Sequence, residues 1–95
     1  MKVRFELLAL FRAKAGAERL EVEVPASAPT VLAALRTLAA CTPQLGDLLR
    51  GEQLRDGVLV FVKEAGGATR RVLAPAAETL GAGQALVVST AMGGG

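Results

Sequence analysis

The chain contains no histidine, no tryptophan and no tyrosine, and its 95 residues include a single cysteine, Cys41. Without histidine, the sequence excludes His-ligated metal sites, Ser-His-Asp triads and Cys-His catalysis, and we expect no bound metal. One cysteine cannot form an intramolecular disulfide, so we expect a reducing, cytoplasmic location. Because Cys41 ends an apolar helical stretch, we expect it to behave as a small hydrophobe rather than as a reactive thiol.

Charge is also scarce. The formal net charge is +2, and the basic residues are scattered, with only Arg70 and Arg71 adjacent. Nucleic-acid-binding modules normally carry a denser basic patch, so we expect no nucleic-acid partner. The chain has no apolar run long enough to span a bilayer, and Lys2, Arg4 and Glu6 interrupt its first residues. These features argue against a signal peptide and against membrane association.

Two strands and a helix are predicted in the first half of the chain. Apolar residues alternate with charged ones in 3–7 and in 20–24, which predicts two strands. A turn at 13–17 would join them, most simply as a hairpin. A helix is predicted to begin after Thr30, a suitable N-cap, and to end at Thr42, which precedes a proline. Its apolar stripe comprises Val31, Leu32, Leu35, Leu38 and Ala39.

Further strands are predicted at 58–63 and 85–90, with a short edge strand at 69–73. The segments 44–56 and 75–80 are turn-rich, with at most a helical turn in each. The order strand, strand, helix, strand, short strand, strand predicts an α+β β-grasp fold, in which one helix crosses a mixed sheet. We assign residues 1–90 to this domain and residues 91–95 to a flexible, glycine-rich C-terminal tail.

The glycines Gly93, Gly94 and Gly95 follow the last predicted strand. Because glycine has no Cβ, such a segment adopts extended and positive-φ conformations and can pass through a narrow channel. As a C-terminus, the segment would present an exposed carboxylate that another protein can activate. The plain alternative is that these glycines are a frayed end or a linker.

Strand alternation predicts a surface for a partner protein. In 58–63 the valines are expected to face the core, which places Leu59 and Phe61 on the opposite face; Val87 is expected to face outward from the last strand. With Met92 at the root of the tail, these residues would form an apolar docking patch. A shift of the alternation by one residue would instead place Phe61 in the core, and the sequence leaves both possibilities open.

Taken together, these features resemble the ubiquitin-like sulfur carriers, which include MoaD, the small subunit of molybdopterin synthase, and ThiS of thiazole synthesis. The resemblance spans nearly the whole chain and is closest to MoaD. The motifs that carry it are Leu10-Phe11-Arg12 followed by Ala15-Gly16, Pro29-Thr30-Val31 with Leu35 and Leu38, Leu80 with Gly83, and the final Gly94-Gly95.

The resemblance implies a chemistry for the tail. An activating adenylyltransferase of the MoeB or ThiF type would use ATP to convert the Gly95 carboxylate into an acyl-adenylate, with Gly93 and Gly94 threaded into that enzyme. A persulfide protein would then supply sulfur, leaving a thiocarboxylate on Gly95. The expected acceptor is the large subunit of molybdopterin synthase (MoaE type), in molybdenum cofactor biosynthesis. The chain would bind no cofactor itself and would serve as a co-substrate without catalytic activity of its own.

Other acceptors and other functions are compatible with the same sequence. The sulfur acceptor could be the thiamine thiazole, a tRNA base or an activated serine used for cysteine synthesis. The activated glycine could instead form an isopeptide bond with a lysine, which would make the chain a protein modifier. In a third class, a β-grasp interaction module, the tail would be inert.

Overall fold

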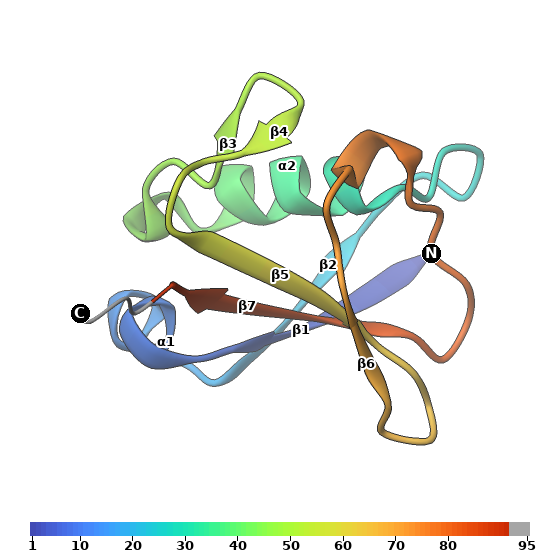
Figure 1. Cartoon of the computed structure of the whole chain (residues 1–95), viewed down its shortest axis with the longest axis horizontal. Coiled ribbons are helices and arrows are strands. Elements are labelled where there is room, and N and C mark those ends of the chain that lie inside the picture. Colours follow the sequence, from blue (N-terminus) through green and yellow to red (C-terminus); the bar gives the residue numbers. More distant parts are fainter. Residues whose placement is uncertain (92–95) are drawn as a thin grey trace.

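The computed structural model describes residues 1–91 and shows a five-stranded sheet with one long helix packed across one of its faces (Figure 1). The strand order is β2-β1-β7-β5-β6. The neighbours β1 and β7 are parallel, whereas the other adjacent pairs are antiparallel. A mixed sheet crossed by one helix confirms the predicted α+β β-grasp fold.

The elements follow the chain in this order: β1 (Lys2–Leu7), α1 (Ala9–Ala15), β2 (Arg19–Glu23), α2 (Val31–Cys41), the 3-10 turn η1 (Pro43–Leu45), β3 (Leu49–Arg50), β4 (Gln53–Leu54), β5 (Val58–Lys63), β6 (Thr69–Arg71), the 3-10 turn η2 (Pro75–Ala77) and β7 (Ala85–Thr90). None of the helices within residues 1–91 has the length and apolar character needed to cross a membrane.

The connection between β1 and β2 differs from the prediction. The turn expected at 13–17 is wrong, because the helix α1 occupies most of this connection. Its alanines and leucine are strong helix formers, and it buries Phe11, which is 5% exposed. The helix ends at Gly16, whose φ of 73° lies in the left-handed region and whose N–H donates to the carbonyl of Arg12 at 3.0 Å.

The crossing helix α2 begins and ends where the sequence predicts. The Thr30 hydroxyl oxygen accepts a hydrogen bond from the N–H of Ala33 at 3.1 Å, as an N-cap should. The buried stripe differs in one member: Ala34 is fully buried, whereas Ala39 is only half-buried. Cys41, the last residue of α2, is exposed, so the expectation that it packs as a small hydrophobe is wrong.

The hydrophobic core lies between α2 and the inner face of the sheet. Its largest fully buried side chains are Phe5, Leu7, Leu35, Leu38, Leu45, Leu48, Leu86, Val3, Val24, Val31, Val60 and Val62. The small hairpin formed by β3 and β4 was not predicted, because each of its strands has only two residues and carries no alternation. The helical turn allowed for in 75–80 is η2. The turn allowed for in 44–56 was misplaced, because η1 spans Pro43–Leu45, directly after α2.

Candidate functional site

The face of the sheet turned away from α2 carries the predicted docking residues. Along β5 the valines at 58, 60 and 62 are buried in the core, whereas Leu59, Phe61 and Lys63 are half-buried on the other face. The predicted parity is therefore confirmed, and the alternative that Phe61 belongs to the core is wrong. Leu59 and Phe61 are placed outside the core cluster by the alternation of strand side chains.

Val87 also lies on this outer face, but it is nearly covered. Its neighbours Leu86 and Val88 are fully buried in the core, whereas Val87 lies outside the core cluster and is 8% exposed. The reason is its position: β7 lies between β1 and β5, so Val87 is flanked by Glu6 on one side and by Phe61 on the other. Val87 therefore lies at the bottom of this face, and its side chain does not project from the surface.

These side chains surround a shallow apolar hollow of about 380 Å³. We call this pocket the apolar hollow; the residues that line it are Leu8, Leu59, Phe61, Thr69, Val87 and Ser89. Leu8, which the sequence did not single out, is 43% exposed at the rim. An open hollow with apolar walls is suited to receive a large apolar side chain of another protein.

A charged pair lies on the same outer face of the sheet and lines a separate hollow beside Ala85. The Nζ of Lys63 on β5 lies 3.1 Å from a carboxylate oxygen of Glu6 on β1, and the two side chains reach each other across β7. The residue of β7 that lies opposite Lys63 is Ala85, whose small side chain leaves room for this bridge. A half-exposed ion pair of this kind contributes little to stability, but it makes the part of the outer face around Ala85 polar.

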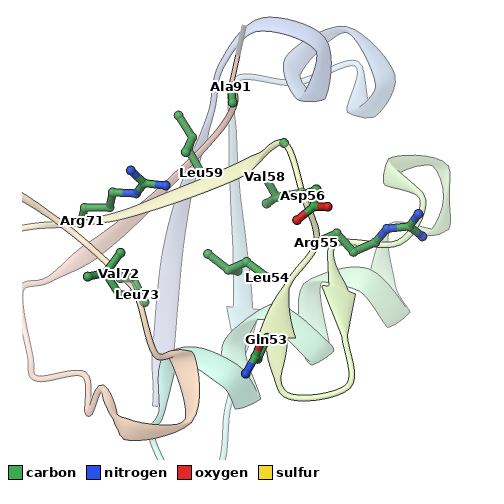
Figure 2. Close-up of a pocket in the computed structure, with 11 residues that line it drawn as sticks. Gln53, Leu54, Arg55, Asp56, Val58, Leu59, Arg71, Val72, Leu73 and Ala91 are labelled. Atoms are coloured by element: carbon green, nitrogen blue, oxygen red, sulfur yellow. The ribbon is translucent and has the colours of Figure 1, made fainter. Parts of the chain in front are cut away.

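A second hollow lies where β7 ends. The N–H of Ala91 donates to the carbonyl of Gly57 at 2.8 Å, which joins the end of β7 to the turn before β5. Beside this bond is a groove of about 260 Å³, lined by residues 53–59, 71–73 and Ala91, which we call the tail-root groove (Figure 2). Figure 2 shows the Arg71 side chain directed toward Leu59, whereas Arg55 points away from the groove.

The predicted tail residues lie outside the described part of the chain. Met92, Gly93, Gly94 and Gly95 follow Ala91 directly in the sequence. The tail-root groove therefore adjoins the point from which that segment continues, and the apolar hollow reaches Ser89, two residues earlier. The assignment of residues 91–95 to a flexible tail stays a prediction, as do the roles of Met92 and the three glycines.

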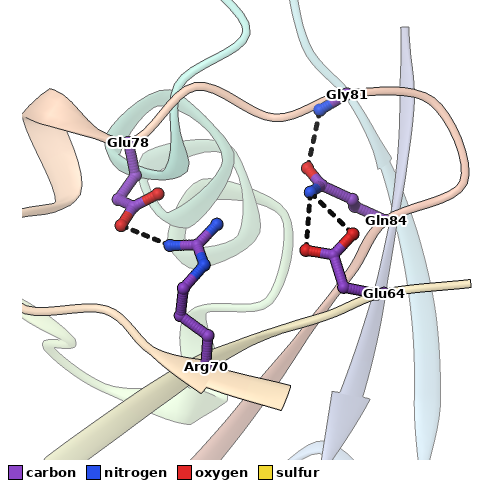
Figure 3. A network of polar contacts seen from close by, with 5 residues as sticks. All are labelled: Glu64, Arg70, Glu78, Gly81 and Gln84. Carbon is purple, nitrogen blue, oxygen red and sulfur yellow. Dashed lines mark hydrogen bonds and ion pairs between the residues drawn. The ribbon is translucent and has the colours of Figure 1, made fainter. Parts of the chain in front are cut away.

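Polar contacts hold the loop that leads into β7 (Figure 3). The side-chain oxygen of Gln84 accepts a hydrogen bond from the N–H of Gly81 at 2.7 Å, while its amide nitrogen donates to both carboxylate oxygens of Glu64 at 3.0 and 3.1 Å. Nearby, Arg70 donates to Glu78, and this hydrogen bond together with the carboxylate charge raises the pKa of the guanidinium. The start of β7 is thereby tied to β5 and β6.

Residues 1–91 contain no group of three or more histidine, cysteine, aspartate or glutamate side chains that could hold a metal ion. The described part of the site therefore consists of an apolar hollow, a tail-root groove and a few charged groups. Such a surface can bind a partner protein and position a chain segment, and the residues that line it include no histidine or cysteine to act as base or nucleophile.

Comparisons with known proteins extend the fold assignment. No protein-family model matches the sequence, and no curated protein matches it at a significant level. Among solved structures, the crystal structure of SAMP1 from Haloferax volcanii is similar over the full length of both chains, with a TM-score of 0.78 at 23% identity. At that identity the likeness concerns the fold.

Two further structures from the same organism are similar. The solution structure of the Haloferax volcanii HVO 2177 protein has a TM-score of 0.78 at 28% identity and covers 100% of this chain and 87% of its own. A crystal structure of H. volcanii small archaeal modifier protein 1 has a TM-score of 0.70 at 26% identity, covering 93% of this chain and 94% of its own. Two of these three structures are therefore of a small archaeal modifier protein, and the likeness of all three supports the ubiquitin-like β-grasp fold of this chain.

Proposed function

We propose that this protein is a ubiquitin-like sulfur carrier whose Gly95 carboxylate is adenylated, converted to a thiocarboxylate and used as a sulfur donor. The observation that carries the proposal is the course of β7. This strand lies in the middle of the sheet, passes beneath the apolar hollow and ends at Thr90. The next residue, Ala91, lines the tail-root groove, and the sequence continues through Met92 into three glycines.

The proposed chemistry requires activation because a carboxylate resists nucleophilic attack. One carboxylate oxygen of Gly95 attacks the α-phosphorus of ATP, which forms the acyl-adenylate and releases pyrophosphate. The terminal sulfur of a protein persulfide then attacks the carbonyl carbon and AMP departs, leaving an acyl disulfide. A thiolate cleaves the S–S bond of that intermediate, so that the thiocarboxylate is released and a disulfide is formed from the two thiol partners.

In this proposal the carrier supplies positioning rather than catalysis. Glycine at 93 and 94 lets the segment enter a narrow active site, because there is no side chain to exclude. The apolar hollow, through Leu59, Phe61 and Val87, docks the adenylyltransferase of the MoeB or ThiF type, and Met92 extends that contact. The ATP belongs to the activating enzyme, and the carrier binds no cofactor of its own.

The acceptor we propose is molybdopterin synthase, with the protein acting in the cytoplasm as the partner of a MoaE-type large subunit. Support for this acceptor comes from the resemblance of the sequence to MoaD. Thiazole, tRNA and cysteine synthesis use the same thiocarboxylate chemistry, so the acceptor is identified by which purified enzyme consumes the sulfur.

A second candidate function is protein modification. The observation that favours it is the similarity to crystal structures of a small archaeal modifier protein from H. volcanii. The first step is shared with the sulfur carrier, but the activated Gly95 carbonyl is then attacked by the ε-amine of a target lysine. An isopeptide bond forms and the leaving group on the carbonyl departs.

The test is the intact mass of the protein purified from its own cells. A gain equal to the replacement of one oxygen by one sulfur, located on the peptide that contains Gly95, is the expected result. Oxidation of Met92 produces nearly the same gain, so the matched control is the Met92→Leu variant, which removes that ambiguity. Glycine remnants on the lysines of other proteins would favour the modifier. A protein that stays unmodified with an adenylyltransferase, ATP and a persulfide donor would overturn both functions.

A further inference from the structure

The edge of the sheet at β6 is open to another strand, and two hydrogen bonds define its geometry. The N–H of Val72 donates to the carbonyl of Val60 at 2.8 Å, and the N–H of Glu64 donates to the carbonyl of Ala68 at 2.8 Å. In an antiparallel pair, residues that exchange hydrogen bonds alternate with residues whose backbone groups point away from the partner strand. The residues of β6 that lie halfway between bonded positions therefore direct their backbone groups outward.

Two residues of β6 have this outward orientation, Thr69 and Arg71. They lie opposite Lys63 and Phe61 of β5. Their N–H and C=O groups face the side of β6 on which residues 1–91 provide no further strand. Two such residues offer two donors and two acceptors, which is the pattern that an added antiparallel strand requires.

The charge at this edge is basic and comes from Arg71. Arg70 is bonded to Glu78, and Arg55 is paired with Asp47 at 3.0 Å. Within residues 1–91, Arg71 takes part in no ion pair, and its side chain is exposed along the tail-root groove. A partner segment that places a carboxylate beside Arg71 would form an ion pair with it, which no residue of 1–91 does.

An exposed leucine adjoins the same edge. Leu73 lies two residues beyond Arg71 and is 78% exposed, the highest value among the large hydrophobic residues described. It lines the tail-root groove and also a neighbouring hollow of about 200 Å³ formed with residues 52–53 and 74–77. The surface beside β6 is thus continuous from Ala91, at the root of the tail, to η2.

We propose that the protein that adenylates the tail adds an extended segment to β6, with a carboxylate beside Arg71 and an apolar side chain against Leu73. This inference rests on the proposed function and deepens it by identifying the docking edge. The four residues that follow Ala91, up to Gly95, reach at most about 14 Å. An enzyme that holds the Gly95 carbonyl must therefore lie against this end of the domain, where the tail-root groove is.

A second copy of the chain is the competing occupant. The other free edge of the sheet, β2, carries Glu21 and Glu23, so it is an acidic strand that could pair with β6 of a neighbour. The two occupants are distinguished by sedimentation of the protein alone. The adenylating partner predicts a monomer at assay concentrations, whereas self-association that is abolished by Arg71→Glu would overturn the inference.

The main test is ATP–pyrophosphate exchange with the adenylyltransferase of the same organism. Thr69→Pro removes the outward N–H without breaking a bond to β5, and proline is tolerated on edge strands for this reason. Its matched comparison is Thr69→Val, which keeps the N–H while changing the same side chain of the apolar hollow, so the loss beyond that of Thr69→Val measures the contribution of the N–H. Arg71→Glu reverses the free charge, and its control is Arg36→Glu, which makes the same charge change on the exposed side of α2.

We expect Thr69→Pro and Arg71→Glu each to lower kcat/KM for the carrier about tenfold or more, with kcat within about twofold of wild type. Leu73→Ser should lower kcat/KM in the same way with an unchanged melting temperature, and the loss in Arg71→Glu should shrink at high salt. The Arg36→Glu control should behave as wild type, and Thr69→Val should lose clearly less activity than Thr69→Pro. An active wild type with unaffected variants overturns this inference alone, whereas a wild type that is never adenylated overturns the proposed function and this inference with it.

Discussion

Truncating two neighbouring residues of β5, Val60 and Phe61, should separate the core of this protein from its docking face. Val60 is 0% exposed, so Val60→Ala removes two buried methyl groups and leaves a cavity, which costs about 2 kcal/mol of unfolding free energy. Phe61 faces the open hollow, where solvent can fill the vacated space. Phe61→Ala therefore loses partial burial and its cross-strand contact with Val87, about 1 kcal/mol.

For a domain of this size, each kcal/mol lowers the melting temperature by about 4–8 °C. Thermal denaturation followed by circular dichroism should then show a fall of about 8–16 °C for Val60→Ala and about half of that for Phe61→Ala. Adenylation measured well below both transitions should show the reverse order. Phe61→Ala should lower kcat/KM about tenfold or more, while Val60→Ala stays near wild type.

The reasoning is refuted if Phe61→Ala destabilises the domain more than Val60→Ala, because Phe61 would then act as a core residue. It is equally refuted if Phe61→Ala is adenylated as efficiently as wild type. In that case the apolar hollow would not be the docking surface, although the strand parity would stand.

Three further outcomes are expected. Thr30→Ala should cost about 1 kcal/mol through loss of the N-cap, whereas Thr37→Ala, in the middle of α2, should be nearly neutral; urea denaturation measures both. Gly16→Ala should cost about 1 kcal/mol of unfolding free energy because Gly16 has a left-handed φ of 73°. This cost is backbone strain alone, since an added Cβ would meet no neighbour. Gly66→Ala, where φ is not left-handed, should be neutral or slightly stabilising. Gly94→Val should abolish adenylation without changing the melting temperature, and normal adenylation would contradict the threading argument.

The outer face of the sheet could be predicted because strand alternation is a local property. The bounds of β5 and β7 could be read from local sequence patterns, whereas the alternation left open whether Phe61 faces the core, and only the burial of alternate residues along β5 decided it. The degree of exposure could not be predicted in this way. Val87 is on the predicted face, yet it is nearly covered because two strands from distant parts of the sequence lie on either side of it.

Other features depended on contacts that no local pattern records. The segment that forms α1 has high helix propensity, but a short helix is stable only when it packs, and Phe11 is buried against elements far along the chain. The roles proposed for Leu73 and Arg71 depend on the order of the strands, because a sheet has an edge only once it is assembled. Nothing in the sequence distinguishes this leucine from other leucines, or Arg71 from its neighbour Arg70.

The sequence alone led to the prediction of a chemistry for this protein. Its three consecutive glycines after an apolar strand, together with its resemblance to ubiquitin-like sulfur carriers, predict a carrier of a reactive group, and this prediction depends only on the identity and order of residues. The tertiary structure decided where that chemistry can be presented. The apolar hollow, the tail-root groove and the open edge at β6 arise from pairing between strands that are distant in the chain, and pairing of that kind is specified by packing of the whole domain rather than by any local segment.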